Sequence, residues 1–316
     1  MPPLYQVPTH RTPIPHRNLL IAGAVIVTLA LLVLGYLLYL RTFHPGTYLF
    51  DKVRFGAVTN QIVAPQELKK AVYVNNGRLY SDTFVTVKMQ DWHLATTTSV
   101  IDYARTEHSG VILAFDKTTK EYKVATVDKQ LLASAKVKRS LALSPDGTKV
   151  AYAEANGNPG LPGTWTVVVM DIATGKELYR APGFTVFFLS DATVIRFTQK
   201  GIERTNIADA SSTLLTKSFL LSPVTRAAQS PDRSFLAWTD PQDGMTKVYK
   251  IGDEGAVLQG NASQDIPAGG SLAVSPQSLY WLNVTPKASV LWRYPLTGGS
   301  AQKIREANSF ATKLVF

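Results

Sequence analysis

The sequence predicts an all-β protein, a β-propeller preceded by one transmembrane α-helix. Three observations support this fold class. A turn unit beginning Ser-Pro recurs from residue 144 onward, each copy separates two short alternating apolar segments, and a long uncharged run precedes them all. Repeats of about 40–50 residues are typical of four-stranded propeller blades. The length of the chain favours six blades, with five or seven also compatible.

The clearest copy of the repeat is 141–152, which reads Leu-Ala-Leu-Ser-Pro-Asp-Gly-Thr-Lys-Val-Ala-Tyr. Its proline presets the first corner of a tight turn, its aspartate accepts bonds from nearby amides, and its glycine tolerates a positive φ. Related segments occupy 227–238, 272–281 and, in a degenerate form, 187–197. The four serines stand at positions 144, 190, 230 and 275, so the steps are 46, 40 and 45 residues. This period predicts one blade for each copy.

A third strand and a second turn are expected after the complete copies, at 166–171, 247–251 and 290–294. The first copy carries an insertion before its third strand, 156–163, which reads Asn-Gly-Asn-Pro-Gly-Leu-Pro-Gly. We interpret it as a surface loop, because a phosphate cradle needs a helix N-terminus and a strand follows here instead.

With these motifs the chain resembles the TolB-like (WD40-like) propellers, whose repeats carry a Ser-Pro-Asp-Gly turn between the first two strands of a blade. Residues 144–147 match this turn fully, 230–232 match it without the glycine, and 275–276 match it in part. The resemblance covers 71–316. It implies a six-bladed propeller, placement outside the cytoplasm, and protein binding rather than catalysis.

The chain divides into four predicted segments: a disordered Pro-rich tail at 1–17, a transmembrane helix at 18–40, a membrane-proximal connector at 41–70, and the propeller at 71–316. The uncharged core of the span, 19–40, would be about 33 Å long as a helix, enough to cross a bilayer. A cleaved signal peptide is the alternative. The run is too long for one, and it ends without a small-x-small cleavage site.

The orientation of this anchor is not decided by its flanking charges, because Arg17 and Arg41 bracket the run and further basic residues lie on both sides. The family resemblance favours a cytoplasmic N-terminus and an extracytoplasmic propeller at the plasma (inner) membrane. Large domains also translocate regardless of their charge.

Within the connector, 65–71 begins with proline and acid and ends with lysines, which predicts a short helix. Residues 72–80 predict a hairpin with an Asn-Gly turn. The segment 110–116, followed by a turn at 117–121, looks like the third strand of another blade. The C-terminal segment 309–316 alternates like an innermost strand but has no partner after it. We therefore predict that it pairs with the first hairpin, completes the first blade and seals the ring.

The sequence assigns no catalytic, cofactor-binding or metal-binding residue. It has no cysteine, which excludes thiolate chemistry, and no hydrolase elbow, zincin motif or P-loop occurs. His93 with Asp91, and His108 with Glu107 and Asp102, fall in one predicted blade and are the candidate metal ligands, although surface histidines are the commoner case. Residues 240–244 resemble half a calcium loop without its closing glutamate, and are read as a turn.

The net charge is +10, and a basic run extends over 117–149. This run either forms a solvated face or attracts acidic envelope proteins and anionic polymers. Nucleic acid is disfavoured, because no recognised motif is present. The leading hypothesis is a membrane-anchored, extracytoplasmic propeller that serves as a protein-binding or scaffolding module in the cell envelope. The alternative is an anchored, hydrolase-like enzyme that uses acidic residues at the propeller channel.

Overall fold

The computed structural model describes residues 27–29, 31–33, 72–75, 78–80, 98–106, 109–126, 131–135, 137–217, 221–223, 225–241, 244–252, 255–262, 271–284, 289–297, 300–307 and 311–315. The chain forms two compact units, Met1–Asp51 and Lys52–Phe316. In the first unit, residues 27–29 and 31–33 are helical and their leucines and valines are exposed.

The predicted membrane span is not supported by the described residues. No helix in the described ranges is long and apolar enough to cross a membrane. Most of 18–40 lies outside those ranges, as do the predicted tail at 1–17 and the connector at 41–70 with its short helix. The span therefore stays a prediction.

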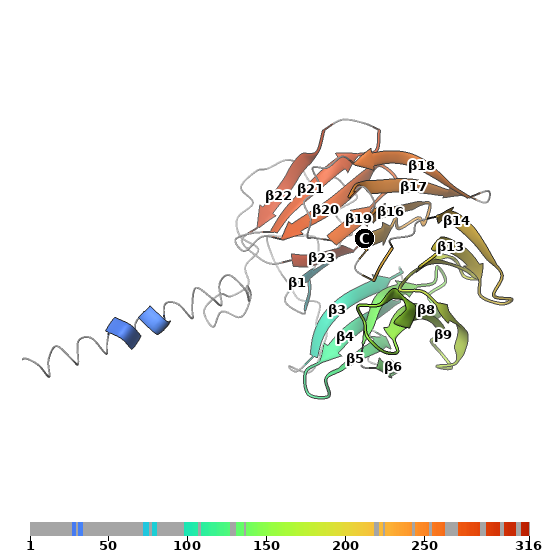
Figure 1. The fold of residues 1–316 in the computed structure, drawn as a ribbon, viewed down its shortest axis with the longest axis horizontal. Coiled ribbons are helices and arrows are strands. Elements are labelled where there is room, and N and C mark those ends of the chain that lie inside the picture. Colours follow the sequence, from blue (N-terminus) through green and yellow to red (C-terminus); the bar gives the residue numbers. More distant parts are fainter. Residues whose placement is uncertain are drawn as a thin grey trace, which may run out of the picture. The chain divides into compact units, whose positions relative to one another are not determined.

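The second unit contains five four-stranded antiparallel sheets, in each of which the strands lie side by side in chain order (Figure 1). We number these sheets as blades 1 to 5. Blade 1 consists of β3 (Thr98–Arg105), β4 (Gly110–Asp116), β5 (Glu121–Thr126) and β6 (Leu131–Ala135). Blade 2 consists of β7 (Lys138–Leu143), β8 (Lys149–Ala155), β9 (Trp165–Asp171) and β10 (Glu177–Pro182). Blade 3 consists of β11 (Thr185–Ser190), β12 (Thr193–Thr198), β13 (Gly201–Asn206) and β14 (Ser212–Lys217). Blade 4 consists of β15 (Ala227–Gln229), β16 (Phe235–Thr239), β17 (Thr246–Gly252) and β18 (Gly255–Ala262). Blade 5 consists of β19 (Ser271–Val274), β20 (Ser278–Val284), β21 (Ser289–Pro295) and β22 (Gln302–Ala307). The β-propeller prediction is confirmed.

A sixth sheet has three strands among the described residues, in the order β2-β1-β23. β1 (Val72–Asn75) and β2 (Arg78–Tyr80) form the predicted hairpin, and β23 (Ala311–Val315) pairs with β1 in antiparallel register. The predicted joining of the two ends of the propeller is confirmed. Because β23 also contacts β19 of blade 5 and β3 of blade 1, this sheet lies between the last and first blades.

One strand was assigned to the wrong place from the sequence. The segment Gly110–Asp116 is β4, the second strand of blade 1, and not a third strand. The innermost strand of that blade is β3, which ends in a turn without the Ser-Pro-Asp motif. There the backbone N–H of Thr106 donates to the carbonyl of Ser109 over 2.8 Å. Without the motif, nothing in the local sequence marks this turn as the first of its blade.

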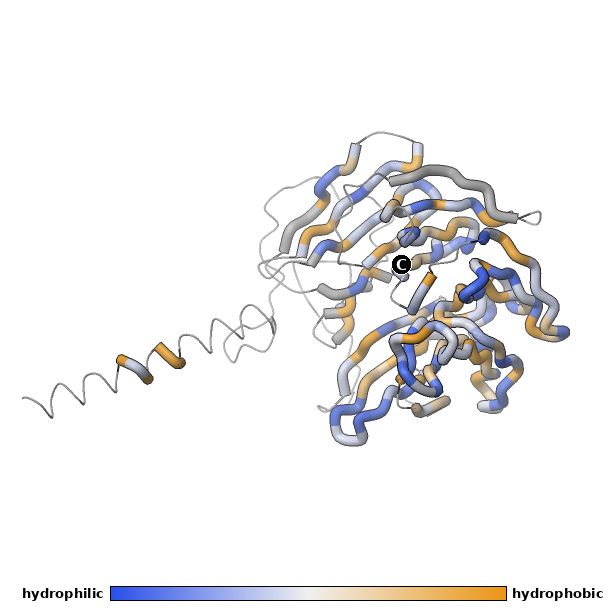
Figure 2. Tube along the Cα trace, viewed as in Figure 1, coloured by the Kyte–Doolittle hydropathy of each residue, from blue (hydrophilic) through white to orange (hydrophobic). Residues whose placement is uncertain are grey.

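The hydrophobic core lies between neighbouring sheets. Apolar and polar residues alternate along many strands (Figure 2), so each sheet presents an apolar face to the next one. Trp238 of blade 4, for example, meets Phe197 of blade 3 edge to face at 6.0 Å and stacks on Tyr249 at 4.3 Å. Trp165 and Trp281 are also buried in clusters that span two or more blades. Tryptophan side chains therefore pack between blades at these three positions.

The Ser-Pro-Asp-Gly turn between β7 and β8 is held together by its own side chains. Ser144 accepts a hydrogen bond at Oγ from the backbone N–H of Lys149 (2.8 Å) and donates from Oγ to Asp146 (2.6 Å). Asp146 also accepts from the backbone N–H of Thr148 (2.9 Å). These bonds explain why serine and aspartate recur in the repeat: each satisfies backbone donors that the tight turn leaves unpaired.

Candidate functional site

A cavity of about 150 Å³ lies where the innermost strands of the sheets converge. All six of these strands contribute to its wall: β3, β7, β11, β15, β19 and β23. Its charged lining residues are Asp102, Arg105, Arg233 and Lys313. Since a pocket with a few convergent polar groups is the default place to look for ligand binding, this central cavity is the candidate site.

Small side chains keep the cavity open. Ala104, Ala142, Ala228 and Ala273 all line it, and each stands two residues before the turn that ends its inner strand. An alanine side chain ends at Cβ, so the four strands approach the centre without filling it. The same spacing in four blades places these methyl groups at one level of the cavity.

Asp102 and Lys313 form an ion pair inside the cavity. The Nζ of Lys313 on β23 lies 2.5 Å from Oδ1 of Asp102 on β3, and the aspartate side chain is only 7% exposed. The carboxylate also accepts hydrogen bonds from the backbone N–H groups of Tyr103 (2.7 Å) and, more weakly, Leu141 (3.4 Å). Both oxygens of Asp102 are therefore engaged by the protein.

Arg233 occupies the glycine position of the blade 4 turn. This turn repeats the bonds of the first copy, because Ser230 accepts at Oγ from the N–H of Phe235 (2.9 Å) and donates to Asp232 (2.5 Å). Arg233 has a φ of 62°, close to the 72° of Gly147 in the blade 2 turn. A left-handed backbone costs a residue with a Cβ about 1–2 kcal/mol.

The two turns differ in the space beside this position. A Cβ at Gly147 would come within 2.1 Å of Oγ of Ser109, in the neighbouring turn of blade 1, so only glycine fits there. Arg233 instead sends its side chain past the blade 3 turn to blade 2, where Nη2 donates to the carbonyl of Leu143 over 3.4 Å. Because blades 2 and 4 are not neighbours in the ring, Arg233 spans one end of the cavity.

The guanidinium of Arg233 is partly withdrawn from solvent. Burial lowers the pKa of Arg233 below its usual value, while the charges of Asp191 and Asp146 act in the opposite direction. Asp191 belongs to the turn between β11 and β12, and accepts a hydrogen bond from the backbone N–H of Asp146 over 2.9 Å. The turns of blades 2, 3 and 4 therefore meet at the end of the cavity that Arg233 crosses.

The carboxylates at this end are suited to structure more than to acid catalysis. Burial raises the pKa of Asp146 and of Asp232, but hydrogen bonds from Ser144 and Thr148 to the first, and from Ser230 and Ser234 to the second, outweigh it. Both pKa values end below the usual range. A general acid needs a raised pKa near the working pH, so these groups lack the property that a channel hydrolase requires.

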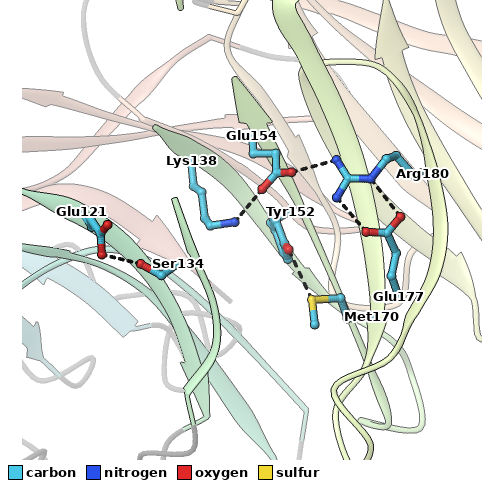
Figure 3. Close-up of polar contacts among 8 residues, drawn as sticks. All are labelled: Glu121, Ser134, Lys138, Tyr152, Glu154, Met170, Glu177 and Arg180. Atoms are coloured by element: carbon cyan, nitrogen blue, oxygen red, sulfur yellow. Dashed lines mark hydrogen bonds and ion pairs between the residues drawn. The ribbon is translucent and has the colours of Figure 1, made fainter. Parts of the chain in front are cut away.

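A second group of charges lies on the face of blade 2, outside the cavity. Figure 3 shows Lys138 and Arg180 approaching Glu154 from opposite sides, each at 2.8 Å, with Glu177 pairing with Arg180 at 2.6 Å. The Lys138 side chain is 1% exposed, and its Nζ lies 3.9 Å from the centre of the Tyr152 ring. Two cations and two acids balance, so this cluster fits a structural role.

The metal hypothesis finds no support in the described residues. Asp91, His93, Glu107 and His108 lie outside them, and Asp102 is bound by Lys313. No group of three or more metal-ligating side chains occurs within the described ranges. In the calcium-like segment 240–244, the backbone N–H of residue 244 donates to the carbonyl of residue 240 over 2.8 Å, and the described part of the segment is a turn.

The described part of the basic run at 117–149 contains paired and buried lysines as well as exposed ones. Lys123 pairs with Asp116 at 2.6 Å, Lys149 lies 3.6 Å from Asp146, and Lys138 is buried. Several of these charges are therefore matched within their own blade.

Sequence reasoning missed the cationic residues of the cavity. Lys313 and Arg105 carry no motif, and Arg233 was noted only as a departure from the repeat. One signal was present: an arginine at a turn position that needs a positive φ is a costly choice.

No protein family model matches the chain, and no curated protein matches it. Solved structures do. TolB from Acinetobacter baumannii has 16% identity and a TM-score of 0.55, with 77% of this chain and 64% of that chain covered. The chain thus spans less than two thirds of the length of that protein. At this level of identity the likeness shows the fold alone.

Two further neighbours have different roles. A puromycin hydrolase S511A mutant complexed with PGG has 14% identity and a TM-score of 0.51, with 73% of this chain and 42% of that chain covered. A nidogen/laminin complex chain has 9% identity and a TM-score of 0.52, with 77% and 96% covered. The neighbours therefore include a hydrolase as well as TolB and a protein from a complex. Likeness of fold does not decide whether this chain is an enzyme.

Proposed function

We propose that this protein is a membrane-anchored, extracytoplasmic β-propeller that binds another protein or an anionic polymer of the cell envelope. One observation carries the proposal. Six inner strands enclose a single cavity whose charged lining consists of three cations and one carboxylate, and that carboxylate is already paired with Lys313. A cavity of this kind offers the positive charge of Arg233 to a ligand.

Binding is favoured over hydrolysis by the state of the carboxylates. Asp102 is held by Lys313 and by backbone N–H groups, and the turn residues Asp146 and Asp232 have lowered pKa values. A hydrolase that works through acids needs one carboxyl group that holds a proton near neutral pH. Neither Asp146 nor Asp232 has the surroundings that would provide it, and Asp102 is already paired with Lys313.

The anchor and the orientation enter the proposal from the sequence. The uncharged run at 19–40 is long enough to cross a bilayer, and the Ser-Pro-Asp-Gly repeat resembles that of TolB-like propellers. With the propeller outside the cytoplasm, the partners within its reach are envelope proteins and anionic envelope polymers. A chain with a net charge of +10 is attracted to such partners.

The experiment that tests this function is site-specific photo-crosslinking in cells that express the full chain. A photoreactive residue replaces Ala192, which is exposed in the blade 3 turn at the Arg233 end of the cavity. The control position is Leu178, an exposed residue of the outer strand β10. We expect one discrete crosslinked species from position 192 and not from position 178, identified by mass spectrometry.

Equal labelling from both positions, or none from position 192, would refute binding at this end of the propeller. A purified full-length chain in detergent is assayed in parallel with peptide and ester substrates. Turnover that is lost on replacing Asp146 or Asp232 by asparagine would favour the hydrolase alternative instead.

A further inference from the structure

The guanidinium of Arg233 is incompletely satisfied by the protein. Arginine has five N–H donors, and the side chain of Arg233 makes one hydrogen bond, to the carbonyl of Leu143 at the long distance of 3.4 Å. It forms no ion pair with a carboxylate of the described residues. Its other donors are not among the buried atoms that lack a partner, so they are accessible to solvent, and Arg233 lines the cavity. A guanidinium held in this way is ready to accept an anion.

The position of Arg233 is maintained against a backbone preference. Its φ of 62° lies in the left-handed region, which favours glycine, and the equivalent residue of the blade 2 turn is Gly147. The turn bonds of Ser230 and Asp232 hold the backbone in place. As a result the arginine side chain leaves the turn toward the cavity, where strain of this kind is often associated with function.

The remaining charges of the lining also favour an anion. Arg105 is the other cation near this end, since it closes β3 at the turn that adjoins Gly147. The one acid of the lining, Asp102, is matched by Lys313. A bound anion would therefore face Arg233 without competing against an unpaired carboxylate of the lining.

We propose that this end of the cavity binds one carboxylate group, with Arg233 as its principal partner. The inference rests on the proposed binding function and specifies its ligand. A cavity of about 150 Å³ can take up a molecule of benzene size, which is room for one acidic side chain or a small carboxylic acid. The planar fork of arginine matches the two oxygens of a carboxylate in a bidentate pair.

A single negative charge fits this place better than a phosphate dianion. Asp146 and Asp191 lie close enough to act on Arg233 electrostatically, and they repel any anion that approaches it. Both this repulsion and the attraction to Arg233 double for a dianion, but the cost of removing the ion from water rises with the square of its charge. The site therefore selects a monocarboxylate.

The test uses the full chain in detergent and a ligand-observed NMR titration at constant ionic strength, with chloride as the balancing anion. The probes are acetate, N-acetylglutamate amide, its neutral counterpart N-acetylglutamine amide, and inorganic phosphate. We expect both carboxylates to bind and the glutamine compound not to bind. Tighter binding of the glutamate compound than of acetate identifies the acidic side chain of a partner as the source, and the reverse order identifies a free acid.

Three variants establish which residues hold the carboxylate. We expect Arg233→Gln to weaken binding about tenfold or more, because a charge-assisted hydrogen bond is lost. The control is Arg204→Gln, since Arg204 of blade 3 also donates a hydrogen bond to a carbonyl of the next blade, that of Gly252 over 3.2 Å, but does not line the cavity. If Arg233→Gln alters the tryptophan fluorescence of the folded chain, Arg105→Gln is measured in its place. We expect it to weaken carboxylate binding as well.

The proposal is overturned if acetate and the glutamate compound bind no better than chloride, or if Arg233→Gln and Arg204→Gln have the same effect. Phosphate binding as tightly as the carboxylates would overturn the preference for a monocarboxylate. If no carboxylate binds but position 192 gives a discrete crosslink, the proposed binding function is retained and its ligand is not a carboxylate. Carboxylate binding without any crosslink would reject the protein partner alone.

Discussion

Lys313 and Asp102 are 211 residues apart in the chain and form an ion pair of 2.5 Å across the junction where the propeller closes. Lys313 belongs to β23, the last strand, and Asp102 to β3, the first strand of blade 1. This contact adds an electrostatic tie to the backbone pairing of β23 with β1. The two ends of the domain are thus joined by main-chain and side-chain bonds at once.

Removing the lysine should destabilise the closed ring. In Lys313→Met the carboxylate of Asp102 stays buried with only backbone donors, so we expect a loss of about 1–3 kcal/mol in the free energy of unfolding. Urea denaturation followed by tryptophan fluorescence measures it. Lys176→Met, at an exposed turn lysine, is the control and should change little. Equal stability of both variants would mean that the tie contributes nothing.

Deleting 309–316 should have a larger effect. The deletion removes β23, whose Leu314 is 2% exposed, together with its ladder to β1, and several kcal/mol should be lost. Since domains are typically stable by only 5–15 kcal/mol, we expect a strongly lowered melting temperature or aggregation. Deletion of residues 1–17 serves as the control. If the two shortened chains melt alike, β23 does not stabilise the ring.

Replacing Arg233 by glycine should separate stability from binding. Glycine adopts a positive φ without strain but gains freedom in the unfolded chain, so we expect Arg233→Gly to raise stability by about 0.5–1 kcal/mol. Carboxylate binding should fall in the same variant. Lys120→Gly is a matched control, because Lys120 is an exposed turn residue with a φ of 57°. It should stabilise the protein similarly and leave binding unchanged; a stability loss in Arg233→Gly would argue against strain.

Acid should weaken the fold through the paired carboxylates of blade 2. Burial raises the pKa of Glu154, but hydrogen bonds from Lys138 and Arg180 outweigh it and lower the pKa overall. The unfolded chain therefore binds more protons at acidic pH, so the contribution of Glu154 is complete above the usual glutamate pKa of about 4.3 and is lost as the pH falls through its lower folded value.

Urea midpoints measured from pH 7 to pH 3 should fall below about pH 4.5. In Glu154→Gln we expect lower stability at pH 7 and a shallower fall, because the substituted amide does not titrate. A decline as steep as that of the wild type would show that other groups govern the acid response.

The orientation at the membrane is tested by protease added to intact bacterial spheroplasts that express the full chain. We expect digestion of 41–316, because the proposal places the propeller outside the cytoplasm. A cytoplasmic marker protein must remain intact in the same sample. Protection of the propeller until the cells are lysed would reverse the proposed topology.

Local patterns were sufficient for much of the fold. The serines at 144, 190, 230 and 275 each mark a turn between the first two strands of a sheet, because a tight turn needs particular residues at particular corners. The C-terminal segment alternates apolar and polar residues and has no partner strand after it. This was enough to predict that β23 joins the first hairpin. These features depend on neighbours in the chain and on the need of every strand for a partner.

The tertiary structure alone decided the rest. β4 was misplaced from the sequence because the turn after β3 lacks the repeated motif, and only the pairing of strands shows which one is innermost. Asp102, Arg233 and Lys313 come together because the closed ring carries strands from distant parts of the chain to one axis. Sequence periodicity reports which face of a strand is apolar, but not which charges meet across a ring, since that distance is set by closure and not by spacing along the chain.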